Sequence, residues 1–285
     1  MNAVAAEAPP EPAARRRTRA WAAAALVLAL LAVAAAAAWW WRAQGPIVAE
    51  GELDVKVERT LPHDPAAFTQ GLEVIDGEVV ESAGQYGASS ARRWDLDTGT
   101  VSDEVAVPEE FFAEGLTALP GGRLVQLTWK EGTALVRDVQ TLEEVDRFSY
   151  EGEGWGLCLD EQGERLVMSD GSAQLTFRDP STFAEVGSVE VTDANGAPVE
   201  RLNELECEDG RVWANVWQTD TIVVIDPDSG DLRATVDASG LLSEAERADA
   251  DVLNGIAALG DGRYLLTGKL WPKAFVVRFV PRTEP

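Results

Sequence analysis

The longest uninterrupted apolar stretch in this 285-residue chain lies close to its N-terminus. Residues 20–41 carry no charged side chain, and a helix over this range would rise roughly 33 Å, enough to cross the hydrocarbon core of a membrane. Trp39, Trp40 and Trp41 close the stretch, and indole rings favour the interface between lipid and water. The pattern predicts one N-terminal transmembrane helix.

The charges that flank this stretch predict its orientation. An arginine cluster ends residues 1–19, whereas only Arg42 follows the apolar stretch closely. Because positively charged flanks stay in the cytoplasm, we expect residues 1–19 to be a disordered cytoplasmic tail, 20–41 a signal anchor and 42–52 a tether. The protein would then be a single-pass cell-membrane protein whose main domain is periplasmic or extracellular. The alternative is a signal peptide that is cleaved after the small residues 32–38.

Beyond the tether, short alternating apolar segments recur in a fixed order. Each unit begins with a polar or aromatic residue. The next residue is glycine in four of the five copies, and an apolar strand follows. The five copies are Gln70-Gly71-Leu72, Glu114-Gly115-Leu116, Trp155-Gly156-Leu157, Asn203-Glu204-Leu205 and Asn254-Gly255-Ile256. They begin at residues 70, 114, 155, 203 and 254, so the repeat period is about 41 to 51 residues.

Each copy continues with a turn and a second strand, then a third strand that ends in a turn rich in Asp, Thr and Ser, and a fourth strand. Four short strands at this period are typical of a propeller blade. The pattern therefore predicts an all-β, five-bladed β-propeller over residues 53–281. The fifth unit ends at residues 274–281 without a fourth strand of its own. We expect the segment from Leu53 to fill that place and to close the ring.

Composition and charge argue against several classes of partner and cofactor. A net charge of −25 argues against nucleic acid as a partner, since phosphate binding needs clustered Lys and Arg. The chain has one histidine, His63, and two distant cysteines, Cys158 and Cys207, so we expect no metal site and no cofactor. The cysteines are expected to be buried apolar residues, and a disulfide in an oxidising compartment is the alternative.

Aligning the repeats places two sets of residues at the mouth of the central channel. The first set precedes the first strand of each unit and consists of Gln70, Glu114, Trp155, Asn203 and Asn254. The second set ends the second strand and consists of Gly84, Trp129, Gly171, Trp217 and Lys269. Single residues of this kind often just satisfy loop backbone groups or pack in a core. Together they indicate a polar site with an aromatic cage, in which the neighbouring Phe111 and Phe112 would raise the pKa of Glu114.

Ten segments in unbroken order resemble the glutaminyl cyclotransferases of plants and bacteria. These segments are FTQGL (68–72), ESAGQYG (81–87), FFAEGL (111–116), LTWKEG (127–132), GEGWGL (152–157), SDGS (169–172), LNELE (202–206), ANVWQTD (214–220), VLNGIA (252–257) and TGKLWP (267–272). The resemblance covers residues 60–280. It implies a five-bladed propeller without a catalytic metal that closes the N-terminal glutamine of peptides or proteins into pyroglutamate and releases ammonia.

The same resemblance implies roles for individual residues. Glu114 would be the general acid and base. Asn203 and Lys269 would be polar catalytic residues, the candidates to hydrogen-bond the developing oxyanion or the substrate carboxamide. Gln70 and the three tryptophans Trp129, Trp155 and Trp217 would bind the substrate. The chain departs from the family pattern at Ala113, where Gly is commoner, and at Cys158 and Cys207, where Thr and an aromatic residue are usual.

Two other functions are compatible with a propeller, because a fold alone does not fix an activity. One is a non-catalytic cell-surface propeller that binds peptide or sugar through the same tryptophans. The other is a propeller hydrolase, such as a lactonase, with calcium in its channel. The interpretation that the resemblance favours is an enzyme acting on glutamine-first peptides. We expect it to be a monomer.

Overall fold

The computed structural model of the chain describes residues 50–283, so the predicted tail and transmembrane helix lie outside the described residues. Within this range the fold is all-β, with twenty strands and one short helix, α2 (Glu244–Arg247). None of the described residues forms a helix that is both apolar and long enough to span a membrane.

Three of the sheets are four-stranded antiparallel meanders in chain order. The first contains β2 (Thr69–Ile75), β3 (Glu78–Ala83), β4 (Ser90–Asp95) and β5 (Val101–Ala106). The second contains β6 (Ala113–Leu119), β7 (Arg123–Thr128), β8 (Thr133–Asp138) and β9 (Glu144–Ser149). The third contains β10 (Leu157–Asp160), β11 (Arg165–Ser169), β12 (Gln174–Arg178) and β13 (Glu185–Glu190).

The remaining strands form one eight-stranded sheet in the order β14-β15-β16-β17-β1-β20-β19-β18. Its strands are β14 (Leu202–Glu208), β15 (Arg211–Val216), β16 (Thr221–Ile225), β17 (Leu232–Asp237), β1 (Gly51–Pro62), β20 (Lys273–Pro281), β19 (Arg263–Gly268) and β18 (Leu253–Gly260). Strand β1 pairs antiparallel with β20, in a register that places Leu53 opposite Pro281. The predicted place of the first strand beside residues 274–281 is therefore confirmed. A parallel pairing of β1 with β17 joins the two halves of this sheet.

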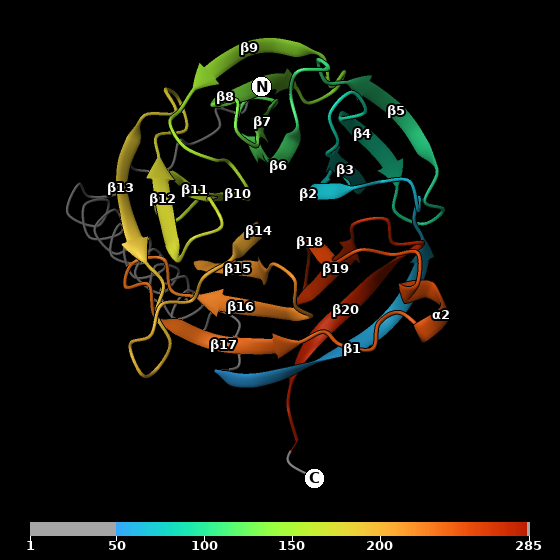
Figure 1. Cartoon of the computed structure of the whole chain (residues 1–285), viewed down its shortest axis with the longest axis vertical. Coiled ribbons are helices and arrows are strands. Elements are labelled where there is room, and N and C mark those ends of the chain that lie inside the picture. The colour runs from blue at the N-terminus through green and yellow to red at the C-terminus, as the bar shows by residue number, and fades with distance from the viewer. Residues whose placement is uncertain (1–49, 284–285) are drawn as a thin grey trace, which may run out of the picture. The chain divides into compact units, whose positions relative to one another are not determined.

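The sheets surround a common centre, with β2, β6, β10, β14 and β18 innermost (Figure 1). Each of these inner strands contacts the next, and β18 contacts β2, so the inner strands form a closed ring. They approach closely because small residues face the neighbouring backbone. A Cβ on Gly115 would lie 2.6 Å from the Trp155 carbonyl oxygen, which no side chain tolerates. Because the inner strands all start at one end of the ring, the first residues of these strands gather there.

The two cysteines form a disulfide between neighbouring inner strands. Cys158 lies on β10 and Cys207 on β14, and their Cα atoms are 5.4 Å apart although 49 residues separate them in sequence. Of the two possibilities that the sequence left for the cysteines, the structure therefore has the disulfide, with Cys158 buried. Residues about one repeat apart lie side by side on adjacent inner strands, so the repeat period itself brings the two sulfur atoms together.

Candidate active site

The polar residues of the first predicted set lie at β-bulges. The pairing register shifts in β2 between Thr69 and Gly71, which leaves Gln70 as the extra residue. The same irregularity in β6, β14 and β18 contains Glu114, Asn203 and Asn254. These residues lie within the strands, and the expected position just before the strand was wrong. A bulge leaves a residue out of the ladder and redirects its side chain, which is how a strand end delivers a polar group to a site.

The second predicted set shares one backbone hydrogen bond in four of its five members. In each case an N–H donates to the carbonyl two residues before the bulged residue. The pairs are Gly84 to Phe68 (2.8 Å), Trp129 to Phe112 (2.9 Å), Trp217 to Arg201 (2.9 Å) and Lys269 to Val252 (3.0 Å). This bond confirms the shared position inferred from the sequence repeats and fixes where the side chains of Trp129, Trp217 and Lys269 begin.

All seven predicted site residues line one cavity of about 430 Å³ at this end of the ring. They are Gln70, Glu114, Trp129, Trp155, Asn203, Trp217 and Lys269. Six further residues complete the wall, namely Phe68, Gln85, Phe112, Gln218, Asp251 and Val252. Sequence reasoning assigned none of these six to the wall, although it named Phe112 as an apolar neighbour of Glu114. Phe111 instead packs in a core cluster with Val107, Ala113 and Leu135.

A chain of amide donors fixes the Glu114 carboxyl group. The Gln70 Nε2 donates to Glu114 Oε1 at 3.0 Å, and the Asn254 Nδ2 donates to Gln70 Oε1 at 3.1 Å. The Asn254 Nδ2 also donates to the Thr69 carbonyl at 3.0 Å. Asn254 does not line the cavity, but its hydrogen bond to Gln70 orients the Gln70 side chain. The arrangement leaves Glu114 with one held oxygen and one oxygen that can act on a ligand.

Burial and nearby charges shift the pKa values of the two ionisable groups in the cavity. Burial raises the pKa of Glu114 well above its ordinary value; the Lys269 charge opposes this rise, while Glu153 and Glu131 add to it. Burial lowers the pKa of Lys269, against the attraction of Glu114 and Asp251. The Lys269 Nζ lies 4.9 Å from the centre of the Phe68 ring. The two shifts bring the pKa values of the carboxyl group and of the ammonium group closer together, which favours proton transfer at this site.

Asn203 presents an unused acceptor. The residue is only 2% exposed, and its Oδ1 is buried without a hydrogen-bond partner. Buried amide oxygens are almost always paired in folded proteins, because leaving one unpaired costs about 1 to 3 kcal/mol. Because Asn203 is a wall residue of the cavity, its unpaired Oδ1 is a candidate acceptor for a ligand N–H.

Aromatic rings form the walls around these polar groups. Trp155 and Trp217 meet edge to face with centroids 5.5 Å apart, and Phe112 meets Trp129 in the same way at 5.7 Å. The third repeat has Gly171 at the position where the second, fourth and fifth repeats have Trp129, Trp217 and Lys269. Its φ of +83° disfavours any side chain, and a Cβ there would lie 2.7 Å from the Trp155 ring. The missing side chain makes room for the Trp155 indole.

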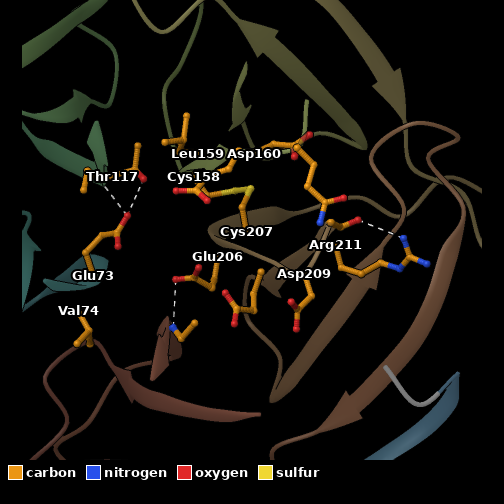
Figure 2. Close-up of a pocket in the computed structure, with 16 residues that line it drawn as sticks. Glu73, Val74, Thr117, Cys158, Leu159, Asp160, Glu206, Cys207, Asp209 and Arg211 are labelled. Atoms are coloured by element: carbon orange, nitrogen blue, oxygen red, sulfur yellow. Dashed lines mark hydrogen bonds between the residues drawn. A yellow bond between two sulfur atoms is a disulfide. The ribbon is translucent and has the colours of Figure 1, made fainter. Parts of the chain in front are cut away.

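A second pocket lies at the opposite end of the inner strands and is acidic (Figure 2). The Glu73 Oε1 accepts hydrogen bonds from the Thr117 hydroxyl and the Ala118 N–H, and Glu206 accepts from the Ala258 N–H. Each carboxyl group thus satisfies a backbone N–H of the adjacent inner strand. Burial raises the pKa of Glu206 well above its ordinary value, and Glu73 adds to the rise. No three His, Cys, Asp or Glu side chains among residues 50–283 are grouped to hold a metal ion.

The fold and the cavity define an all-β protein with a cavity that is walled by aromatic rings and contains a buried carboxyl group and a buried amine. A family model described as glutamine cyclotransferase matches residues 24–279, and the chain belongs to this family. It is 42% identical over 232 residues to a glutaminyl-peptide cyclotransferase of Arabidopsis thaliana, over 79% of this chain and 71% of the relative. The crystal structure of the Myxococcus xanthus glutaminyl cyclase is 39% identical, with a TM-score of 0.72, and the match covers 81% of this chain and 98% of that one.

Proposed function

We propose that the chain is a glutaminyl-peptide cyclotransferase, which closes the N-terminal glutamine of a peptide or protein into pyroglutamate and releases ammonia. The observation that carries this function is the buried Glu114 carboxyl group, held by Gln70 at one oxygen and enclosed by aromatic rings in a cavity that also contains Lys269 and Asn203. Family membership supports the same reaction.

The reaction needs one nucleophile, which the substrate itself supplies. The α-amine nitrogen attacks the γ-carboxamide carbon, a C–N bond forms, and the bond from that carbon to the carboxamide nitrogen breaks. Glu114 accepts a proton from the attacking amine and delivers one to the departing nitrogen, which leaves as ammonia. The carboxyl group ends in the state in which it began. Its raised pKa suits both transfers, since an acid–base group works best when its pKa lies near the working pH.

The other polar groups position the substrate and stabilise charge. The unpaired Asn203 Oδ1 accepts a substrate N–H, and the Lys269 ammonium group faces the oxygen on which negative charge develops. Trp129, Trp155 and Trp217 hold the glutamine side chain folded back on its amine and exclude water, which would hydrolyse the amide to glutamate. The cavity accommodates one residue, so selectivity beyond the second residue of the peptide should be weak.

We further infer five blades. The three four-stranded sheets are three of them, and strands β14 to β17 are the fourth. Strands β18, β19, β20 and β1 are the fifth, and the β17–β1 pairing links it to the fourth. The closed ring of inner strands supports this division.

We also propose a cellular location and an oligomeric state for the protein. The Cys158–Cys207 disulfide supports an extracytoplasmic domain, because structural disulfides persist in oxidising compartments. The charge-free residues 20–41, preceded by four arginines, support a single-pass membrane anchor with the catalytic domain in the periplasm or outside the cell. We propose that the protein acts as a monomer.

The full chain, incubated with a short glutamine-first peptide, tests the function. The peptide should lose the mass of one ammonia, and free ammonia should appear in equal amount. Glu114→Gln should abolish both while thermal unfolding stays within a few degrees of the wild type. Folded wild-type protein that binds the peptide but releases no ammonia would indicate the non-catalytic binding propeller instead.

A further inference from the structure

The third repeat contributes an acidic residue that touches two walls of the cavity at once. Glu153 lies in the connection between β9 and β10, within the GEGWGL segment, and its side chain is 40% exposed. Its Oε2 accepts hydrogen bonds from the Trp129 Nε1 at 2.8 Å and from the Trp155 Nε1 at 3.0 Å. One carboxylate oxygen therefore holds both indole N–H groups.

The two tryptophans come from different sheets, so their mutual orientation is not fixed by one backbone ladder. Trp129 follows β7 of the second sheet, and Trp155 precedes β10 of the third. The backbone brings Glu153 into place, because the N–H of the next residue, Gly154, donates to the Trp129 carbonyl at 2.8 Å. Lys130 completes the group, with its Nζ 3.6 Å from Glu153 Oε1 and 3.6 Å from the centre of the Trp129 ring.

We propose that Glu153 is a positioning residue that sets the angle and the separation of the Trp129 and Trp155 rings, and thereby the shape of the slot for the glutamine side chain. An indole ring needs a partner for its N–H and otherwise turns about its side-chain bonds. Rings held through a common atom cannot turn independently. The kinetic part of this inference rests on the proposed function.

Glu153 keeps its charge under working conditions. Burial acts to raise the pKa of Glu153, but the N–H donors of Trp155 and Trp129 and the Lys130 ammonium outweigh it, so that the pKa lies below its ordinary value. An ionised oxygen is a stronger acceptor than an amide oxygen, and it has lone pairs for two donors.

Three variants of the full chain separate positioning from other effects. Glu153→Ala removes the shared acceptor. Glu153→Gln keeps one oxygen that can accept from both indoles but removes the charge. Glu151→Ala alters an exposed residue of the same connection and is the matched control. The measurements are kcat and KM with a glutamine-first peptide, and the near-ultraviolet circular dichroism of the tryptophans, with thermal unfolding to verify folding.

We expect Glu153→Ala to raise KM about tenfold, equivalent to about 1.4 kcal/mol, and to change kcat less than threefold. It should also weaken the tryptophan circular dichroism. Glu153→Gln keeps a weaker acceptor and should fall between Glu153→Ala and the wild type in both measurements, and the control should match the wild type. An unchanged KM and an unchanged spectrum in Glu153→Ala would overturn the inference. Equal losses in the Ala and Gln variants would overturn it too, because charge rather than the shared hydrogen bond would then be responsible. If the wild type releases no ammonia, the proposed function fails, while the spectra still decide whether Glu153 holds the rings.

Discussion

The side chains of the site are oriented by residues of other repeats rather than by their own sequence segment. Gln70 orients Glu114 from the preceding sheet, and Asn254 orients Gln70 from the last one. The repeat alignment and the family resemblance together singled out the seven residues that line the cavity, because an aligned repeat shows which positions depart from a packing residue. Glu153 could not be given a role in this way, since its function depends on two indole nitrogens that meet only in three dimensions.

Lys269 offers a test of the electrostatic coupling at the site. The Lys269 charge opposes the burial that raises the pKa of Glu114, so removing the charge should raise this pKa further. We expect Lys269→Met to lower kcat about 100-fold, because a donor to the developing oxyanion is lost. The limb of the pH–rate profile that reports Glu114 should move to higher pH. Lys56→Met, which changes an exposed cation on β1, should leave the profile in place; a limb that moves to lower pH in Lys269→Met would contradict the coupling.

The positions of the strands could be predicted from the sequence more accurately than the β-bulges within them. Alternation of apolar residues marks the inner and middle strands, whose side chains are largely buried, and the turns between them carry Asp and Gly. The bulges at the start of β2, β6, β14 and β18 leave no alternation to read, because the extra residue interrupts the period of two. This is why the polar residues were placed just outside the strands and lie just inside them.

The disulfide joins two of these elements and should contribute to stability. Closing a segment of 49 residues between β10 and β14 reduces the entropy of the unfolded chain, which corresponds to about 3 to 4 kcal/mol. We expect the double variant Cys158→Ser, Cys207→Ser to unfold in guanidinium chloride with a free energy lower by about this amount and to retain activity when folded. Wild-type protein unfolded under reducing conditions should match the variant. Equal stability of the oxidised protein and the variant would show that the bond adds nothing.

The acidic end of the inner strands predicts a dependence of stability on pH. Burial raises the pKa of Glu206 and of Glu204 well above their ordinary values in the folded state. A group with a raised folded-state pKa contributes stability below its unfolded pKa and loses it as the pH rises through the folded value. The free energy of unfolding should therefore fall as the pH rises above about 5, and Glu206→Gln should flatten this fall. Urea titrations at several pH values measure this dependence of the free energy of unfolding on pH.

Glu161→Gln changes an exposed position of the same pocket and is the control, so its unfolding free energy should fall with pH as in the wild type. The same fall in Glu206→Gln would show that Glu206 is not responsible for it.

At the scale of the whole molecule, the repeat pattern predicted how the ring closes. The fifth unit lacks a fourth strand of its own, and the segment from Leu53 belongs to no other unit, so the two could be matched from the amino-acid sequence alone. The parallel pairing of β1 with β17 could not be predicted, because it joins edges that belong to different repeats and carries no signal in either. The disulfide was left open for a similar reason, since its geometry depends on which inner strands are neighbours.

A permuted chain tests the closure. Leu53 lies opposite Pro281, so the end of β20 is close to the start of β1 and a short glycine-rich loop would connect them. We expect a chain that starts at His63 and ends with residues 51–62 after this loop to keep its activity and to unfold within about 1 kcal/mol of the unpermuted 51–283 fragment. It should refold faster, since the closing pair becomes a hairpin. Refolding that is equally slow in both chains would show that ring closure does not limit the rate.

The pairing of β1 with β20 also determines when the domain can complete its fold. Asp54 and Arg282, which are bonded across this pairing, are 228 residues apart, so the ribosome makes one long before the other. Until the last strand emerges, the edge of β1 that pairs with β20 has no partner, and this open edge is exposed to other chains. The domain therefore cannot complete its fold during synthesis.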